Sequence, residues 1–357
     1  MAHDTLSIRA KLTRQSFALD VAFDVSLGET LALVGPSGAG KSTCVAAVAG
    51  LLRLECGRVG FDDEVWCDTS LGIDCPPHRR RIGFVHQDYA LFPNLNVRDN
   101  VAYGARARRS SRPIALAKAS EWLERLGIGE FADRPVGALS GGQRQRVALA
   151  RALASGARVL LLDEPFGSLD LSTRNVVRRQ LRGFLRDVQL PTVLVTHDPT
   201  DALTLAERIA ILEDGHIRQT GTCEELLTRP QTPFVAELFG LNFFRAVLPP
   251  GQGLREAVVG GTVFHVIATD HEGPVALAFA PSAVTLSIEK PEGSAQNTFL
   301  GTVLEIIPLM ERIRVMLNCG VTVAADVVRD AAVTLDLVRG RTVWASVKAT
   351  AIQVYPT

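Results

Sequence analysis

A glycine-rich loop with one lysine and one serine is the first part of the sequence that could do chemistry. The segment GPSGAGKS, Gly35 to Ser42, follows an apolar strand pattern, TLALV, and precedes a helical pattern. Glycines in such a loop let successive backbone N–H groups approach phosphate oxygens without a clash from Cβ atoms. The spacing G-x-x-x-x-G-K-S therefore predicts a Walker A loop, in which Lys41 reaches the β and γ phosphates of a nucleotide and the Ser42 hydroxyl binds Mg²⁺.

Two adjacent acids end a second apolar strand pattern. The segment RVLLLDEP places Asp163 and Glu164 at the carboxyl end of that strand, where a carboxylate can hold Mg²⁺ beside the phosphates. Glu164 is then the candidate general base for an attacking water, an effect worth about 10²- to 10⁴-fold in rate. A helix cap is the alternative for such a pair, but the Walker A loop upstream favours the magnesium site and the base.

Two further polar residues follow strand patterns of their own. His197 follows TVLVT, and Gln87 follows RIGFV after one residue. Because ligands of open α/β sheets lie at the carboxyl ends of the strands, both side chains should reach the nucleotide. A lone histidine is usually structural, but its position at a strand end favours a contact with the γ phosphate. The neutral amide of Gln87 suits a sensor of Mg²⁺ or water that must also release it.

A second glycine turn, ALSGGQRQRVALARA at 138–152, has the composition of an anion site without a lysine. Its two glycines precede a helical pattern from Gln143 onward, and unsatisfied N–H groups and the helix dipole favour an anion there. A lysine-poor site and a lysine-rich site in one chain make sense if each covers one face of a nucleotide and the two come from different molecules. The chain is therefore expected to be inactive alone.

The elements that must position these residues alternate along the chain. Strand patterns lie at 30–34, 81–85, 158–162, 192–196 and 208–212. Helical patterns between the last three predict a mainly parallel sheet covered on both faces. The helical pattern over 113–126 has no strand of its own, so we place a helical insertion at about 88–140. After about residue 238, short alternating strands broken by Gly and Pro predict a small β-barrel.

The composition excludes several classes of protein. A chain of 357 residues is long enough for two domains. Lys and Arg total 38, as do Asp and Glu, so no overall charge attracts nucleic acid or an anionic membrane. The N-terminus has no apolar segment typical of a secretory signal, and no run approaches the length of a transmembrane helix. We therefore expect a cytoplasmic protein without a nucleic-acid partner.

Basic runs and cysteines give weaker signals. The runs HRRR at 78–81 and RARRSSR at 106–112 are expected to be solvated loops. The six cysteines form no Cys-x-x-Cys pair, so we expect reduced and mostly buried thiols rather than a metal site. Cys44 is the exception, because it lies in the first turn of the helix after the glycine loop, where a thiol pKa can be lowered.

Five motifs, in this order and spacing, resemble those of the nucleotide-binding subunits of ATP-binding cassette (ABC) transporters. They are GPSGAGKS, HQDYALFP, LSGGQRQR, LLLDEPFGSLD and VTHD, and the resemblance covers roughly residues 5–238. It implies an ATPase that uses ATP and Mg²⁺, with Glu164, His197 and Gln87 in catalysis and Ser42, Gln87 and Asp163 at the metal. The nucleotide-binding residues it implies are Gly35, Pro36, Ser37, Gly38, Ala39, Gly40, Lys41, Ser42 and Thr43.

The same resemblance implies a dimer. The LSGGQ segment is similar to the signature motif that closes over ATP held by the Walker A loop of a second copy, and here it comprises Leu139, Ser140, Gly141, Gly142 and Gln143. Ser168, Leu169 and Asp170 would form the loop across the dimer interface. An aromatic residue ahead of the Walker A strand usually stacks on adenine in this family. Phe17 is the nearby candidate, and packing in the core is its alternative.

The C-terminal part resembles that of molybdate-type importer ATPases, whose tail is a TOBE domain. The implied fold is an α/β P-loop NTPase, an ABC cassette with a helical insertion, over residues 1–238, followed by a small all-β OB-like barrel over residues 239–357. The implied partners are a second copy, integral membrane permease subunits at the cytoplasmic face of the membrane and, indirectly, a solute-binding protein. The apolar stretch YALFP at 89–93 is either a groove for the permease or a buried loop.

The transported solute and the role of the tail stay open at this point. Molybdate or tungstate is favoured, and sulfate, ferric iron, polyamines and sugars are the alternatives, because the solute does not touch these motifs. An ABC ATPase outside transport is disfavoured, since the sequence has neither heptads nor a second set of Walker motifs. The tail is interpreted as a dimerisation or packing element, and a sensor that binds the transported oxyanion is the alternative.

Overall fold

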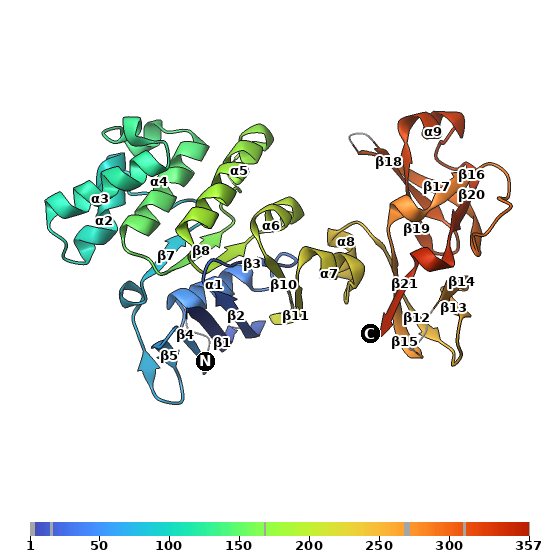
Figure 1. The fold of residues 1–357 in the computed structure, drawn as a ribbon, viewed down its shortest axis with the longest axis horizontal. Helices are drawn as coiled ribbons and strands as arrows, with labels where there is room; N and C mark the ends of the chain where they lie inside the picture. Colours follow the sequence, from blue (N-terminus) through green and yellow to red (C-terminus); the bar gives the residue numbers. More distant parts are fainter. Residues whose placement is uncertain (1–3, 15–16, 168, 268–271, 310–311, 357) are drawn as a thin grey trace. The chain divides into compact units, whose positions relative to one another are not determined.

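The computed structural model describes residues 4–14, 17–167, 169–267, 272–309 and 312–356. The chain divides into two compact units, Met1–Cys223 and Glu224–Thr357 (Figure 1). None of the helices in these described ranges is long and apolar enough to cross a bilayer.

Five parallel strands form the centre of the N-terminal unit. They are β3 (Thr30–Val34), β7 (Ile82–Val85), β8 (Val159–Asp163), β9 (Thr192–Val195) and β10 (Arg208–Glu213). Their order across the sheet is β10-β3-β9-β8-β7, and each neighbouring pair is parallel. The five predicted strand patterns are thereby confirmed. Strands β3 and β9 are buried along their whole length, as expected for strands covered on both faces.

The same sheet continues through strands that the sequence analysis did not predict. These are β1 (Thr5–Arg14), β2 (Phe17–Ser26), β4 (Cys56–Phe61), β5 (Glu64–Asp68), β6 (Ile73–Asp74) and β11 (His216–Gly221). Strands β1 and β2 pair antiparallel, and their buried residues alternate with exposed ones. The alternation of Leu6, Ile8, Ala10 and Leu12 was the signal in the sequence. Among the described residues the sheet has eleven strands.

Helices pack on this sheet or on one another. They are α1 (Lys41–Ala49), α2 (Val97–Ala107), α3 (Arg112–Arg125), α4 (Gly141–Ala154), α5 (Leu171–Val188) and α6 (Pro199–Leu205). The helix predicted over 113–126 is α3, and α2, α3 and α4 pack on one another. Helix α1 contacts β1, β2, β8 and β9, so the end of the Walker A loop is anchored directly on the sheet.

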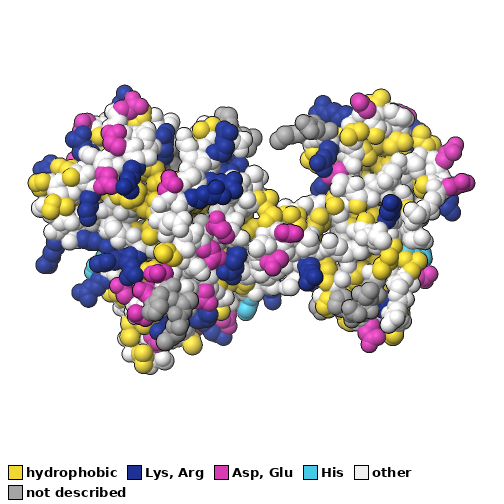
Figure 2. Space-filling model, viewed as in Figure 1, with side chains coloured by type: hydrophobic (Ala, Val, Ile, Leu, Met, Phe, Trp, Pro, Cys, Tyr) yellow, Lys and Arg dark blue, Asp and Glu magenta, His cyan; other side chains and the backbone are white. Residues whose placement is uncertain are grey.

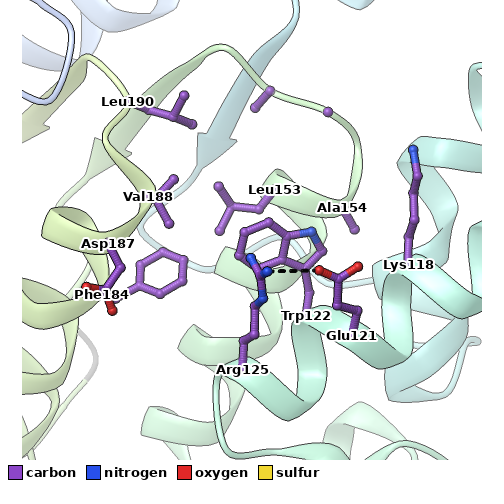
Figure 3. A pocket seen from close by; sticks show the side chains of 12 residues that line it. Lys118, Glu121, Trp122, Arg125, Leu153, Ala154, Phe184, Asp187, Val188 and Leu190 are labelled. Carbon is purple, nitrogen blue, oxygen red and sulfur yellow. Dashed lines mark ion pairs between the residues drawn. The ribbon is translucent and has the colours of Figure 1, made fainter.

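A groove lies between α3 and α5 over the end of α4 (Figure 3). Trp122 and Phe184 meet there edge to face, with ring centroids 6.1 Å apart. Arg125 lies over the Trp122 ring, 4.9 Å from its centroid, and pairs with Glu121 at 3.1 Å. The hollow has a volume of about 720 Å³. The described residues that line it include none from the glycine loop, so this groove is separate from the nucleotide site.

The prediction that the basic run HRRR at 78–81 is a solvated loop is wrong for Arg80. Arg80 is 1% exposed, whereas Arg79 beside it is exposed. The Arg80 guanidinium donates to the carbonyl oxygens of Val48 at 2.9 Å and Cys75 at 2.7 Å, and it pairs with Asp74 at 3.1 Å. Val48 lies in the last turn of α1, where carbonyls lack partners within the helix. Burial of Arg80 therefore follows from a contact with α1 that the local sequence does not indicate.

The C-terminal unit is built mainly of antiparallel strands. A curled five-stranded sheet has the order β16-β20-β17-β18-β19, with β16 (Thr285–Ser287), β17 (Asn297–Leu309), β18 (Arg312–Asn318), β19 (Thr322–Val328) and β20 (Thr342–Val347). A three-stranded sheet contains β12 (Asn242–Leu248), β15 (Gly273–Phe279) and β21 (Gln353–Pro356), and a two-stranded sheet contains β13 (Leu254–Val259) and β14 (Thr262–Ile267). Three short helices accompany them, α7 (Cys223–Thr228), α8 (Pro233–Leu238) and α9 (Arg329–Thr334).

A separate hydrophobic core holds the C-terminal unit together. It is centred on fully buried side chains such as Phe264, Val275 and Val315. Phe264 also contacts the rings of Phe244 and Phe299, at centroid distances of 5.2 and 4.9 Å. Apolar side chains also show on the surface of this unit in Figure 2. The exposed apolar residues of this unit include Val247, Val258, Leu300, Val328 and Val333, each more than half exposed.

Candidate nucleotide site

The predicted Walker A loop forms a cradle at the carboxyl end of β3. Gly38 and Gly40 have φ angles of 82° and 102°, which glycine adopts without strain. A Cβ atom at Gly40 would lie 2.4 Å from the Phe17 ring, so the ring would have to move to admit one. The backbone thus has the conformation and the room that a phosphate cradle needs.

Lys41 is held inside this loop. Its ammonium donates to the carbonyl oxygens of Gly35 at 2.7 Å and Pro36 at 2.8 Å. Burial lowers the pKa of Lys41, and the nearby carboxylates of Glu164 and Asp163 oppose that shift. The loop therefore positions a cation at the mouth of the cradle, where it can bind phosphate oxygens.

A pocket of about 390 Å³ opens in front of the loop. It is lined by Arg14, Phe17, Ser37, Gly38, Gly40, Lys41, Ser42, Thr43 and Glu164. Phe17 is partly exposed at the start of β2, so its ring is both packed against the loop and open to a ligand. Arg14 was not singled out by the sequence analysis. Among the described residues that line this pocket, none comes from the segment 139–143.

Oxygen ligands suited to Mg²⁺ lie beside this pocket. The Ser42 hydroxyl donates to Asp163 Oδ1 at 3.2 Å, and Gln87 lines an adjoining hollow together with Ser42 and Asp163. Burial raises the pKa of Asp163, while the Ser42 hydrogen bond acts in the opposite direction. Mg²⁺ is commonly held by one or two carboxylates together with substrate phosphates. One carboxylate, one hydroxyl and one amide therefore fit this ion.

Glu164 and His197 come together from the ends of two neighbouring strands. His197 Nδ1 lies 3.2 Å from Glu164 Oε1, because β8 and β9 pair in parallel and the Glu164 N–H donates to the Val195 carbonyl at 2.9 Å. Glu164 has a φ angle of 46°, a left-handed conformation that costs energy for a non-glycine residue. Such a conformation persists only where surrounding contacts hold it.

The turn after Gln87 is held by contacts that the sequence analysis missed. Tyr89 and Ala90 both have left-handed backbone conformations. Arg151 of α4 donates to the carbonyl oxygens of both residues, at 2.8 and 2.7 Å. The Tyr89 hydroxyl donates to the Pro165 carbonyl at 3.2 Å. The turn is therefore tied both to the helix of the second glycine turn and to the residue after Glu164.

The stretch YALFP, interpreted from the sequence as either a groove for the permease or a buried loop, contains both buried and exposed residues. Tyr89 is buried, whereas Phe92 is 36% exposed. Phe92 packs against the exposed ring of Tyr103 on α2, with centroids 4.4 Å apart. Tyr89 thus fits the interpretation as a buried loop, whereas Phe92 forms an exposed aromatic pair with Tyr103.

Similarity to known proteins decides the family. A family model described as ABC transporter matches residues 19–167, and one described as TOBE domain matches residues 293–354. A molybdenum import ATP-binding protein of Mycobacterium tuberculosis is 40% identical over 349 residues, which are 95% of this chain and 94% of that protein. The chain belongs to the ATP-binding subunits of ABC transporters.

Two further relatives of this ABC subunit differ in how much of the chain they match. A molybdate/tungstate import ATP-binding protein of Pyrococcus abyssi is 32% identical over 94% of the chain and 95% of its own length. A sulfate/thiosulfate import ATP-binding protein of Bacillus cereus is 44% identical over 238 residues, 65% of each protein. The resemblance to the ABC family and the TOBE tail predicted from the sequence are confirmed.

The signature segment of this ABC subunit begins a helix. Ser140 caps α4, because its hydroxyl accepts from the Gln143 N–H at 3.3 Å while the Gln143 side chain accepts from the Ser140 N–H at 2.8 Å. The helix therefore begins at Gly141, two residues earlier than predicted. Leu139 is buried and Gly142 is buried, whereas Ser140 is exposed. Ser140 is exposed at the start of the helix, and the N–H groups of Gly141 and Gly142 lie in its first turn, where N–H groups lack partners within the helix.

The loop predicted to cross the dimer interface is described in part. Leu169 is buried, and Asp170 caps α5 by accepting from the Thr173 N–H at 3.0 Å. Ser168 lies outside the described residues. The aspartate of this loop thus has a local structural role as the start of α5.

The thiol of Cys44 does not behave as its position in the helix suggested. Its side chain is fully buried, and burial raises the pKa of the Cys44 thiol to about 12. The prediction of a lowered pKa is wrong, because the loss of water around a thiolate outweighs the favourable end of a helix. Of the other cysteines, Cys67 and Cys319 are buried and Cys56 is exposed.

Proposed function

We propose that this ABC subunit hydrolyses ATP as a dimer with a second copy of itself and thereby drives the import of an oxyanion, molybdate or tungstate. The observation that carries the proposal is the contact between Glu164 and His197 directly beside the Walker A pocket. A carboxylate and an imidazole at this place can activate water and contact the terminal phosphate.

The roles we assign follow from the positions of the side chains. Lys41 and the loop N–H groups bind the phosphates, and Phe17, which lines the same pocket, stacks on adenine. Glu164 accepts the proton of the attacking water, and His197 orients Glu164 and contacts the γ phosphate. Ser42, Asp163 and Gln87 would hold Mg²⁺, which would neutralise charge on the phosphates.

The dimer is supported by the separation of the two anion sites. The described residues of the Walker A pocket include none from the signature segment, while the exposed Ser140 is left at the surface. A second copy can supply that segment to the open side of the pocket. Because the γ phosphate then contacts both chains, ATP stabilises the closed dimer and hydrolysis releases it.

The permease is proposed to dock near the exposed aromatic pair of Phe92 and Tyr103. These rings follow Gln87 in the chain. The turn after Gln87 is tied by Arg151 to α4, the helix that begins with the second glycine turn, and by Tyr89 to Pro165, the residue after Glu164. A helix of the permease, resting at the cytoplasmic face of the membrane, would contact this pair. Movement of Gln87 could then be transmitted to the permease, which receives the solute from a solute-binding protein.

The choice of solute rests on the C-terminal unit. The molybdenum and molybdate/tungstate import relatives match 95% and 94% of this chain, whereas the sulfate/thiosulfate relative matches 65% of it. The exposed apolar side chains of this unit, among them Val247, Val258 and Val333, support its use in packing between two copies.

Uptake in cells tests this proposal. Cells that lack their own molybdate importer would express this subunit with its permease and solute-binding protein, and uptake of labelled molybdate would be followed with and without excess sulfate. We expect uptake that sulfate does not suppress and that Glu164→Gln abolishes. Uptake of labelled sulfate in place of molybdate would contradict the assignment of the solute, and uptake unaffected by Glu164→Gln would contradict the assignment of the motor.

A further inference from the structure

Arg174, in the first turn of α5, contacts two segments of the site at once. Its Nη1 lies 3.1 Å from Asp198 Oδ2, and its Nη2 donates to the Phe166 carbonyl at 3.3 Å. The side chain is 17% exposed, so water screens these contacts only in part. A planar guanidinium presents donors on separate nitrogens in fixed directions, whereas an ammonium presents its three donors on a single nitrogen.

The two segments are those that carry Glu164 and His197. Phe166 lies two residues after Glu164, in a turn closed by the Gly167 N–H, which donates to the Glu164 carbonyl at 3.0 Å. Asp198 directly follows His197 in the chain. Arg174 therefore bridges the same two segments whose catalytic side chains, Glu164 and His197, meet at 3.2 Å.

The Asp198 end of this bridge is fixed by a buried network. Arg178 pairs with Asp201, and its Nη2 lies 3.3 Å from Asp198 Oδ2. The Thr196 hydroxyl donates to Asp201 Oδ2 and accepts from the Asp198 N–H, both at 3.0 Å. Two arginines and two aspartates balance in charge, and breaking one buried pair would leave its partner uncompensated. The segment around His197 is thus held on both sides of the histidine.

We propose that Arg174 is a positioning residue for ATP hydrolysis, which holds the segments of Glu164 and His197 in register from the start of α5. The strained backbone of Glu164 needs such support, since a left-handed residue relaxes when its surroundings loosen. Because α5 begins at the loop expected at the dimer interface, Arg174 also places that loop in direct connection with both catalytic segments. This inference rests on the proposed function of the subunit.

Steady-state ATP hydrolysis by the subunit in complex with its permease tests the inference. We expect Arg174→Met to lower kcat by about 10²-fold, the loss typical of a catalytic group displaced by about 1 Å, with the KM for ATP within about twofold of the unmodified value. Arg174→Lys should recover part of kcat, because it keeps one charge near Asp198 but cannot reach both acceptors. Arg179→Met is the matched control, since Arg179 is an exposed arginine on the same helix.

A second background separates positioning from a general structural role. In a Glu164→Gln protein, where the proposed base is already removed, adding Arg174→Met should lower the residual rate by no more than about threefold. If Arg174→Met instead left kcat unchanged, raised only the KM, or cost the same factor in both backgrounds, the inference would be overturned. If Arg174→Met fails to fold, Asp198→Asn serves as the second variant. It keeps the shape of the side chain and should also lower kcat. Absence of hydrolysis by the unmodified complex would contradict the proposed function itself.

Discussion

Replacing Glu164 with glutamine is the sharpest test of how this site works. The substitution keeps the size and one acceptor oxygen of the side chain, so the contact with His197 Nδ1, now 3.2 Å long, can persist. The side chain is 22% exposed, and the buried Lys41 ammonium keeps the nearby carboxylate of Asp163 after the change. The change should therefore leave the fold and the Walker A loop as they are.

The expected effect is large because only proton acceptance is lost. A general base contributes about 10²- to 10⁴-fold in rate, which corresponds to about 3 to 5 kcal/mol in the activation free energy at 1.36 kcal/mol per tenfold. We expect phosphate release by the variant complex to fall by this factor. ATP binding should persist, and dimers should accumulate because the γ phosphate is no longer removed.

Two measurements check this prediction together. Phosphate release gives kcat, and size-exclusion chromatography with ATP and Mg²⁺ gives the fraction of dimer. Asp187→Asn, at an exposed acid on α5, is the matched control and should leave both unchanged. Hydrolysis within about threefold of the unmodified rate would refute the role of Glu164 as base, whereas loss of ATP binding would show that Glu164 acts on the substrate complex rather than on water.

Three further predictions follow from the same geometry. Ser140→Arg and Lys41→Ala should each abolish hydrolysis, but an equal mixture should recover up to about a quarter of the sites through mixed dimers; a mixture as inactive as its parts would count against sites shared between two chains. Cys44 should resist alkylation at pH 8 while the exposed Cys56 reacts, and equal labelling of both thiols would contradict this. Because the pKa of Cys44 is raised from 9.0 to about 12 in the folded protein, the contribution of this thiol to stability should be full below pH 9 and be lost between pH 9 and 12. Arg80→Met leaves the Val48 and Cys75 carbonyls without their donor and should destabilise the N-terminal unit by about 2 to 4 kcal/mol. The thermal midpoint of unfolding should fall in Arg80→Met but not in the control Arg79→Met. Equal midpoints would show that water replaces the guanidinium.

Several features of the site could be predicted from the sequence because each is local. The Walker A loop needs only glycines, a lysine and a serine at fixed spacing between a strand and a helix, and the structure has that loop with Gly38 and Gly40 in left-handed conformations. The meeting of Glu164 and His197 followed from a simple rule, since two parallel neighbouring strands bring their carboxyl ends to one edge.

Other features could not be predicted because they depend on residues far apart in the chain. Arg80 looked like part of a solvated basic run, yet it is buried against the end of α1. Arg151 and Arg174 appear in the sequence as ordinary charges on helices, and their contacts with the turn after Gln87 and with Asp198 required the packed arrangement. Periodicity along a helix shows which face is apolar, but it does not show which backbone carbonyl a long side chain reaches.

The sequence by itself determined the chemistry of the nucleotide site and the two-part organisation of the chain, since phosphate recognition is encoded in the backbone of one short loop and strand alternation in the period of apolar residues. Tertiary structure decided what surrounds that chemistry. It buried Cys44 and so raised its pKa instead of lowering it, it extended the parallel sheet with the antiparallel strands β1, β2 and β4, and it brought Arg174 into contact with the segments that carry Glu164 and His197. Burial and long-range hydrogen bonds depend on which surfaces meet, and that is settled only when the whole chain packs.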